Sequence, residues 1–166
     1  MSNNFLEIIG STVLVSVAGH SDVPAKVDTG ADTSSIWASN IQMTPDGILE
    51  FTLFGKGSPF YTGEVLRRSD YKVAVVRSAT GEEQIRYRTH LPLKIHGRRI
   101  NALFNLSNRS RNNAPILIGK RAIRGKFMVD VSQRAVELPK NSRTKGLNKE
   151  LKDNPYGFHQ KYQKGA

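Results

Sequence analysis

The sequence predicts an all-β, barrel-like domain over about residues 5–139, and three observations favour this class. Short apolar segments recur along the chain, with turn-forming Gly, Asn, Asp or Ser residues between them. Some of these segments alternate, so that Val13, Val15 and Val17 fall on one face of a strand. The chain also lacks a repeat of roughly 20 to 50 residues and a regular alternation of strands with helices, which argues against solenoids and parallel α/β folds.

Each predicted strand combines β-branched or aromatic residues with a turn signal at one end. In chain order the strands are 5–9, 12–19, 24–30, 34–39, 48–55, 71–78, the two halves of 84–106 around His96-Gly97, and 115–119. FMVDV and AVEL are expected to close the domain as a hairpin around Ser132-Gln133. KRAIRG, at 120–125, fits one or two helical turns that end at Gly125.

The composition excludes some chemistries. The chain has no cysteine, which removes disulfides, thiol catalysis and cysteine-based zinc sites. Its first ten residues show no basic region followed by an apolar one, so we expect no signal peptide. No apolar run approaches the roughly 20 residues of a membrane span. We therefore expect a cytoplasmic protein that makes no membrane contact.

The charge is strongly basic and partly concentrated in the last residues. The formal net charge of +11 favours polyanions or acidic surfaces as partners. Residues 140–166 hold seven Lys or Arg against Glu150 and Asp153, with almost no apolar periodicity. We divide the chain into a domain at 1–139 and a basic, disordered tail at 140–166. A solvated tail is favoured over a nucleic-acid arm, and a polyanion contact is the alternative.

The segment AKVDTGADTSSI, at 25–36, places Asp28 between an apolar strand and a Thr-Gly turn. A lone carboxylate hydrolyses amides poorly. Two carboxylates that share one proton do it well, because one takes a proton from water while the other protonates the carbonyl oxygen. The chain has one such Asp, and a two-fold dimer would supply the second from a symmetric copy.

This segment resembles the active-site segment of the retropepsins, the single-domain retroviral-type aspartic proteases. A second family element, an aliphatic strand that ends in Gly before a basic residue and a short helix, is matched by PILIGKRAI. RGKFMVDVSQ further resembles a bacterial retropepsin-like group often labelled as ATP-dependent zinc proteases. The resemblance covers most of residues 12–132. It implies a closed or partly open barrel with one short C-terminal helix and a flap hairpin.

The resemblance assigns roles to the turn. Asp28 would be the catalytic carboxylate, and Thr29 would hydrogen-bond across the dimer axis. Gly30 would allow close approach of the substrate backbone, beside the substrate-binding residues Ala31 and Asp32. No cofactor is implied, and the zinc in the label finds no support, because HExxH is absent and the four histidines at 20, 90, 96 and 159 are scattered.

The segment PILIGKRAI would support the active-site turn. Ile118 would contact substrate, and Gly119 would lie behind the active-site turn. Asp32 would pair with a basic residue of the short helix. Lys120 matches that position, and Arg121 is the alternative; a lysine would make a looser pair because it lacks the fork of arginine.

The family also closes a β-hairpin, the flap, over its substrate. The candidate is the segment 71–88, and an ordinary hairpin is the alternative interpretation. The viral tip is rich in glycine, whereas this tip has Gly81 followed by Glu82 and Glu83. Backbone contacts from this tip to a peptide are therefore less secure. The tip residues expected to contact substrate are Arg77, Ser78, Ala79, Thr80 and Gly81.

Basic residues are frequent around this hairpin. Residues 67–99 carry nine Arg or Lys against Asp70, Glu82 and Glu83. They could steer an acidic substrate. We favour a simpler explanation, in which strands such as IRYR point apolar residues inward and Arg86 and Arg88 outward.

Two further residues have alternative interpretations. Trp37 could line a subsite, although a core or interface role is more common for such a residue. Asp130, in FMVDV, could be mistaken for a second catalytic carboxylate. No Thr-Gly follows it, so a structural aspartate is favoured.

Three functions compete. The first is a homodimeric aspartic endopeptidase that acts on a peptide or protein substrate, with an acidic to near-neutral optimum and residues 5–9 and 127–138 as interface strands. The second is a retropepsin-like module that binds peptides or proteins without cleaving them. The third is a basic nucleic-acid binder that uses the tail, although the sequence shows neither a phosphate loop nor an RNA-binding aromatic pattern.

Overall fold

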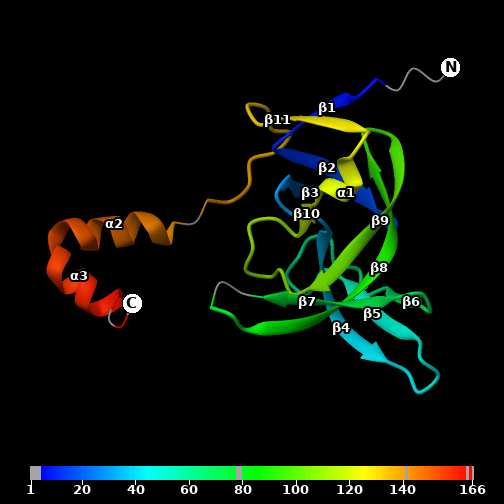
Figure 1. Ribbon diagram of the computed structural model, residues 1–166, viewed down its shortest axis with the longest axis horizontal. Coiled ribbons are helices and arrows are strands. Elements are labelled where there is room, and N and C mark those ends of the chain that lie inside the picture. The colour runs from blue at the N-terminus through cyan, green and yellow to red at the C-terminus, as the bar shows by residue number, and fades with distance from the viewer. Residues whose placement is uncertain (1–4, 78–79, 141, 164, 166) are drawn as a thin grey trace.

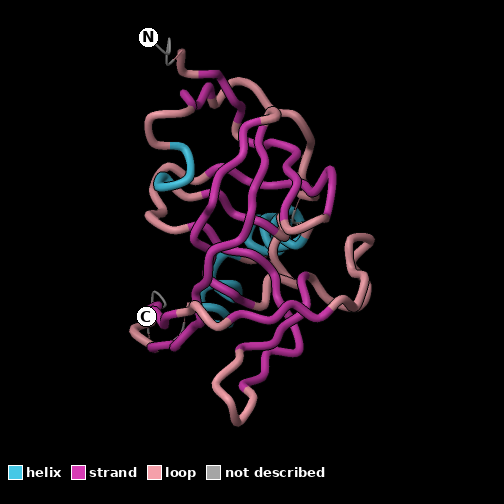
Figure 2. Tube along the Cα trace, turned by 90° about the vertical axis from the view of Figure 1, so that its right-hand side faces the viewer, coloured by secondary structure: helices cyan, strands magenta, loops and turns pink. Residues whose placement is uncertain are grey.

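A computed structural model describes residues 5–77, 80–140, 142–163 and 165. The strands are β1 Glu7–Gly10, β2 Thr12–Val17, β3 His20–Val27, β4 Ser34–Met43, β5 Leu49–Leu53, β6 Val65–Arg68, β7 Lys72–Arg77, β8 Glu83–Ile95, β9 Arg98–Ser107, β10 Ile116–Ile118 and β11 Phe127–Asp130. The helices are α1 Lys120–Ile123, α2 Arg143–Asp153 and α3 Pro155–Tyr162. Strands make up most of the body (Figure 2), which confirms the all-β class.

The sheet closes on itself as a barrel. Its strands follow the order β10-β3-β2-β8-β9-β4, and β10 also pairs with β4, so these six strands form a ring. β5 and β6 extend the sheet beyond β4, and β7 pairs with the first half of β8 (Figure 1). The barrel core collects the apolar side of each strand, including the predicted Val13, Val15 and Val17. This arrangement is the closed barrel that the resemblance implied.

The last strand of the domain pairs with a different partner from the one predicted. β11 pairs in parallel with β1, with Glu7 opposite Phe127, and forms a separate two-stranded sheet. AVEL is not a strand, so the predicted hairpin around Ser132-Gln133 is wrong. Ser11 and Thr12 hold this stretch instead, because Ser11 N donates to Gln133 O at 2.8 Å and Ala135 N donates to Thr12 O at 3.1 Å.

The tail contains two helices, and its predicted disorder stays a prediction. The structure describes α2 and α3 there, and Figure 1 shows both away from the barrel. Neither helix has a buried residue. Asn154 caps α3 by accepting from Gly157 N at 3.0 Å, and Pro155 occupies the first turn, a strong local start signal. Apolar periodicity alone overlooked this signal. Among the described helices, none is both long and apolar enough to cross a membrane.

Candidate active site

The predicted catalytic turn lies where β3 ends beside β10. Asp28 N donates to Ile118 O at 2.9 Å, which continues the parallel pairing of β3 with β10 by one residue. The chain then turns, and Gly30 N donates to Asp28 Oδ1 at 2.9 Å. Asp28 is half-buried, whereas Thr29 and Gly30 are exposed. One carboxylate oxygen is therefore held by the backbone at an accessible turn.

The turn packs closely against Gly119. A Cβ at Gly119 would lie 2.7 Å from Thr33 C and 2.8 Å from Thr33 O, so no other residue fits without moving the backbone. Gly119 N donates to Ser34 Oγ at 3.0 Å, and Lys120 N donates to Ala31 O at 2.8 Å. Residues 28–34 and 118–121 thus form one bonded unit. We call residues 28–32 with 118–121 the catalytic turn unit, after the role that the sequence predicts for Asp28.

The basic partner of Asp32 is Arg121. Arg121 Nε donates to Asp32 Oδ2 at 2.8 Å, and Arg121 N donates to Asp32 O at 3.2 Å. The prediction that Lys120 makes this pair is wrong, and the alternative is confirmed. α1 begins at Lys120, so the direction of its first turn sends the next side chain toward Asp32. The two side chains are 56% and 52% exposed, and such a pair contributes about 1 kcal/mol or less to stability.

The other predicted residues have mixed placements. Ala31 lies half-buried inside the turn, beside Asp28. Ile118 is fully buried, so its side chain belongs to the core and its carbonyl meets Asp28. Sequence reasoning missed Ser34, whose hydroxyl accepts the Gly119 amide. A small polar residue shortly after Asp-Thr-Gly-Ala-Asp was the available signal.

The predicted hairpin is present. β7 and β8 pair from Lys72 opposite Arg88 to Arg77 opposite Glu83, and an Arg77–Glu83 ion pair of 2.6 Å closes the outer end. Beyond that pair, Gly81 has φ +85°, a backbone conformation that favours glycine. Ser78 and Ala79 lie outside the described residues, and Thr80 and Gly81 are exposed. A flap role for this hairpin stays a prediction.

The basic side chains of β8 do not point outward as the strand alternation predicted. Ile85 is 75% exposed, whereas Arg86 and Arg88 are half-buried. The apolar-in, basic-out prediction is therefore wrong for this part of the strand. The hairpin projects from the barrel, so its apolar side has no core to cover. On the other face, Arg88 Nε donates to Asn105 Oδ1 of β9 at 3.1 Å.

Asp130 is structural, as favoured. Its carboxylate accepts from Ser132 N at 2.9 Å, from Ser132 Oγ at 2.6 Å and from Gln133 Nε2 at 3.0 Å. The bonds from the Ser132 side chain and backbone hold the pKa of Asp130 below its ordinary value. Asp130 therefore shapes the turn after β11.

Trp37 has the core role that is more common for such a residue, and its subsite role stays a prediction. Its ring packs against the core cluster, and a Cβ at Gly55 would lie 2.6 Å from it. It also lines a cavity of about 510 Å³ with Phe60 and Arg109. As for metals, no group of three or more His, Asp or Glu that could hold an ion occurs within the described residues.

The sequence that forms this barrel and turn matches a known family. A family model described as retropepsin-like aspartic endopeptidase RimB matches residues 9–140. The chain belongs to the RimB-like family.

Two relatives of this RimB-like chain extend the comparison. A Desulfotalea psychrophila protein named as a probable alpha-L-glutamate ligase is 28% identical over 133 residues, which are 77% of this chain and 29% of that protein. The chain thus spans less than a third of this larger relative. A Legionella pneumophila protein of unknown function (DUF785), known from a crystal structure, is 26% identical in sequence to this chain, and the two structures superpose with a TM-score of 0.59. The match covers 77% of this chain and 95% of the Legionella chain.

Proposed function

We propose that this protein is an aspartic endopeptidase that acts as a homodimer, with Asp28 of two copies sharing one proton. The observation that carries the proposal is the catalytic turn unit, in which an accessible Asp28 is held rigidly by Gly30 and by the strand end at Ile118. One carboxylate takes a proton from water, and its symmetry mate donates a proton to the carbonyl oxygen of the peptide. Gly30 leaves room for the substrate backbone, and Thr29 lies exposed for a contact across the two-fold axis.

The sheet of β1 and β11 supports a dimer. Two exposed apolar side chains lie in this sheet, Ile8 and Met128, and three more flank its strands: Phe5, Leu6 and Val131. Ile8 pairs with Met128 in register, so these two lie side by side. Exposed apolar residues on a short two-stranded sheet favour pairing with another chain. The location matches the interface strands expected from the sequence.

The ligase relative points to a substrate class. That protein is named as a probable alpha-L-glutamate ligase, and a region covering 29% of it is similar to this chain. A peptidase region joined to such a ligase fits a substrate rich in glutamate. The net charge of +11 on this chain agrees with an acidic substrate.

A non-catalytic binding module is the second candidate. The charged end of the hairpin favours it, because the Arg77–Glu83 pair and Glu82 stand where the viral flap has glycines. The intact Asp-Thr-Gly turn favours the endopeptidase, since binding alone has no use for a paired carboxylate.

The test compares the protein with Asp28→Ala and with a control, Asp46→Ala, which removes an exposed carboxylate from a Pro-Asp-Gly turn. Each is sized in solution and then incubated with a glutamate-rich peptide and a denatured protein mixture from pH 4 to 7, and new peptide ends are mapped by mass spectrometry. We expect new ends from the protein and from Asp46→Ala, and none from Asp28→Ala.

Mixing tests the pairing itself. Co-refolding equal amounts of the protein and Asp28→Ala should leave about one quarter of the pairs with two intact Asp28 side chains. Activity near that fraction supports the shared site, whereas activity near one half would show that each chain works alone. A folded dimer that yields no new ends would contradict the endopeptidase and favour the binding module.

A further inference from the structure

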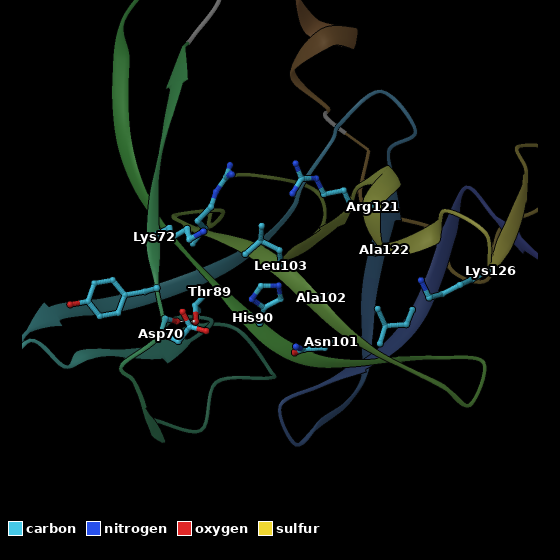
Figure 3. A pocket seen from close by; sticks show the side chains of 13 residues that line it. Asp70, Lys72, Thr89, His90, Asn101, Ala102, Leu103, Arg121, Ala122 and Lys126 are labelled. Carbon is cyan, nitrogen blue, oxygen red and sulfur yellow. Dashed lines mark hydrogen bonds between the residues drawn. The ribbon is translucent and has the colours of Figure 1, made fainter.

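A cavity of about 510 Å³ lies at the other end of β10 from the catalytic turn unit. Pro115, directly before β10, lines this cavity, whereas Ile118 at the end of β10 accepts the Asp28 amide. Figure 3 shows a different cavity, of about 330 Å³, which Arg121 of the turn unit lines. The described linings of the two cavities share no residue. We call the cavity of 510 Å³ the Trp37 cavity, and it is separate from the candidate active site.

Apolar side chains form most of the wall of the Trp37 cavity. They come from β3, from β4, from the loop after β5, from the residue before β10 and from the stretch after β11. Six of them are half-buried: Pro24, Trp37, Phe60, Pro115, Val136 and Leu138. The volume falls in the range of about 300 to 1,000 Å³ that is usual for ligand sites. The cavity therefore offers apolar surface that a ligand of moderate size would cover.

Bonds within the chain hold these walls in place. Trp37 N donates to Pro115 O at 2.9 Å, and the Trp37 ring leaves no room for a Cβ at Gly55. Thr12 Oγ1 donates to Val136 O at 2.6 Å and accepts from Val136 N at 3.1 Å, which ties the stretch after β11 to β2. Because the walls are already ordered, a ligand would bind without a large entropy cost for ordering them.

One basic side chain of the wall has no anionic partner. Arg109 is half-buried, and its Nε donates to Ala114 O at 3.1 Å. Among the described residues no carboxylate pairs with Arg109. Glu137, the one carboxylate in the described lining, pairs instead with Arg134 at 3.5 Å. Burial, and secondarily the charge of Arg86, lowers the pKa of Arg109, but an arginine stays charged at neutral pH. Arg109 is thus a partly desolvated cation without a counterion, which an anion from outside would stabilise.

The composition of the wall selects one kind of anion. The described lining holds one other lysine or arginine, the exposed Lys56, so it does not suit a ligand with many charges. A ligand with one carboxylate and a large apolar group would pair with Arg109 and cover Trp37 at the same time. The last residue of a peptide has both features when its side chain is aromatic or branched. Asn112 and Asn113, which follow Arg109 in the same loop, have side-chain amides that suit the peptide group before it.

We propose that the Trp37 cavity binds the C-terminal residue of a peptide or protein whose last side chain is aromatic or branched aliphatic. The terminal carboxylate pairs with Arg109, and the apolar side chain packs against Trp37 and Phe60. Asn112 and Asn113 hold the last peptide group. Capture of a C-terminal carboxylate is a recurring mode of peptide recognition. The site recruits a partner chain without using Asp28, so the proposal does not depend on the endopeptidase function.

The test reads the cavity directly, because Trp37 is the one tryptophan of the chain and its emission reports on its surroundings. All proteins carry Asp28→Asn, so that the probe is not cleaved. The probe is acetyl-Ala-Ala-Ala-Leu-Phe with a free C-terminus, added up to about 1 mM, a concentration that detects weak binding. One comparison peptide ends in an amide in place of the carboxylate, and another has alanine in place of the last phenylalanine. Calorimetry measures total binding beside the Trp37 emission.

The protein variants remove one of two neighbouring cations. Arg109→Met removes the cation that lines the cavity and keeps a long side chain. Arg111→Met is the matched control, because it makes the same charge change on an exposed arginine of the same loop, outside the described lining. Urea unfolding shows whether each variant is folded. If Arg109→Met is not, Arg109→Lys replaces it and should still weaken binding, since lysine lacks the planar fork.

We expect saturable binding of the probe with a Kd below about 100 μM. Amidation of the probe and Arg109→Met should each raise Kd at least about tenfold, because a charged hydrogen bond is lost. The alanine peptide should also bind at least about tenfold more weakly, whereas Arg111→Met should change Kd less than about twofold.

Four results would overturn the proposal. The first is an absence of binding up to about 1 mM. The second is equal binding of the acid and the amide, a comparison that needs no variant. The third is an equal loss in both arginine variants, because net charge would then explain binding. The fourth is binding seen by calorimetry without a change in Trp37 emission, which would place the peptide elsewhere.

A free acid tests the peptide as the occupant. 3-Phenylpropionate keeps the carboxylate and the ring but has no peptide group. It should bind at least about tenfold more weakly than the probe, because it makes fewer contacts. Equal binding of the two would overturn the peptide as the occupant and favour a small apolar acid.

Discussion

The catalytic turn unit and the outer hairpin of β7 and β8 are held in opposite ways. The turn unit is bonded across distant parts of the chain, and Gly119 lies so close to Thr33 that a methyl group has no room. The outer hairpin pairs with itself and exposes Val73, Val75 and Ile85. Contacts within the chain therefore fix the position of the turn. The hairpin, in contrast, keeps an exposed apolar surface that another molecule could contact. This contrast agrees with the proposed role of Asp28 as the reactive group and with the predicted role of the hairpin as a flap.

Gly119→Ala should have the largest effect of the substitutions that test the contrast between the rigid turn and the exposed hairpin. Its Cβ would meet Thr33 C at 2.7 Å and Ala31 O at 3.0 Å, both backbone atoms, so the turn has to move. We expect the free energy of unfolding to fall by about 3 kcal/mol and cleavage to be lost. Urea unfolding and the cleavage assay measure the two effects.

Gly146→Ala is the matched control. Gly146 lies in α2 with nothing within 4 Å of its Cβ position, so alanine should be neutral or slightly stabilising there. If Gly119→Ala unfolds at the same denaturant concentration as the unchanged protein, the turn is not close-packed and the contrast fails.

The helix that follows the turn offers a smaller test. Arg121→Ala removes the 2.8 Å bond to Asp32, and Lys120→Ala changes the neighbouring cation while leaving that bond intact. We expect Arg121→Ala to lower kcat/KM about tenfold, because the turn loses a positioning contact. Its cost in stability should be about 1 kcal/mol or less, since both partners are half-exposed.

The comparison of these two variants shows whether Arg121, the observed partner of Asp32, or Lys120, the partner first expected, positions the turn. Lys120→Ala should retain most of the activity. If Lys120→Ala is the more damaging substitution, the ion pair seen at Arg121 is not the contact that positions the turn. Arg121→Lys serves as a further check, because a lysine keeps the charge without the planar fork.

The sequence predicted the turn unit better than its surroundings for a physical reason. Gly119 occupies a position that leaves no room for a Cβ, and Asp28 and Gly30 belong to a short Asp-Thr-Gly turn, so the pattern is visible in one sequence. The choice between Lys120 and Arg121 depended on the direction of one helical turn, which residue type does not encode.

The remaining misses also have causes. Alternation predicts burial only where a strand covers a core, and the outer part of β8 does not, so Ile85 is exposed. FMVDV was predicted to pair with the nearest strand in sequence, yet β11 pairs with β1 from the other end of the chain. Such pairing joins residues about 120 positions apart in the chain, which local patterns do not specify.

A substitution at the outer end of the hairpin should have the smallest effect on stability. It tests whether the hairpin contributes to activity without contributing to folding. The side chains of Arg77 and Glu83 are 72% and 52% exposed, so Arg77→Gln should change the free energy of unfolding by about 0.5 kcal/mol or less. The pair nevertheless closes the hairpin. If the hairpin is a flap, we expect kcat/KM to change at least about threefold while urea unfolding does not.

Arg134→Gln is the control, because it breaks a comparably exposed pair with Glu137 outside the hairpin. It should alter neither quantity. Equal activity of Arg77→Gln, Arg134→Gln and the unchanged protein would remove the pair from the mechanism, and the hairpin would then be a projecting element of the fold. A change confined to Arg77→Gln would show that a segment contributing little to folding controls access to the rigid turn.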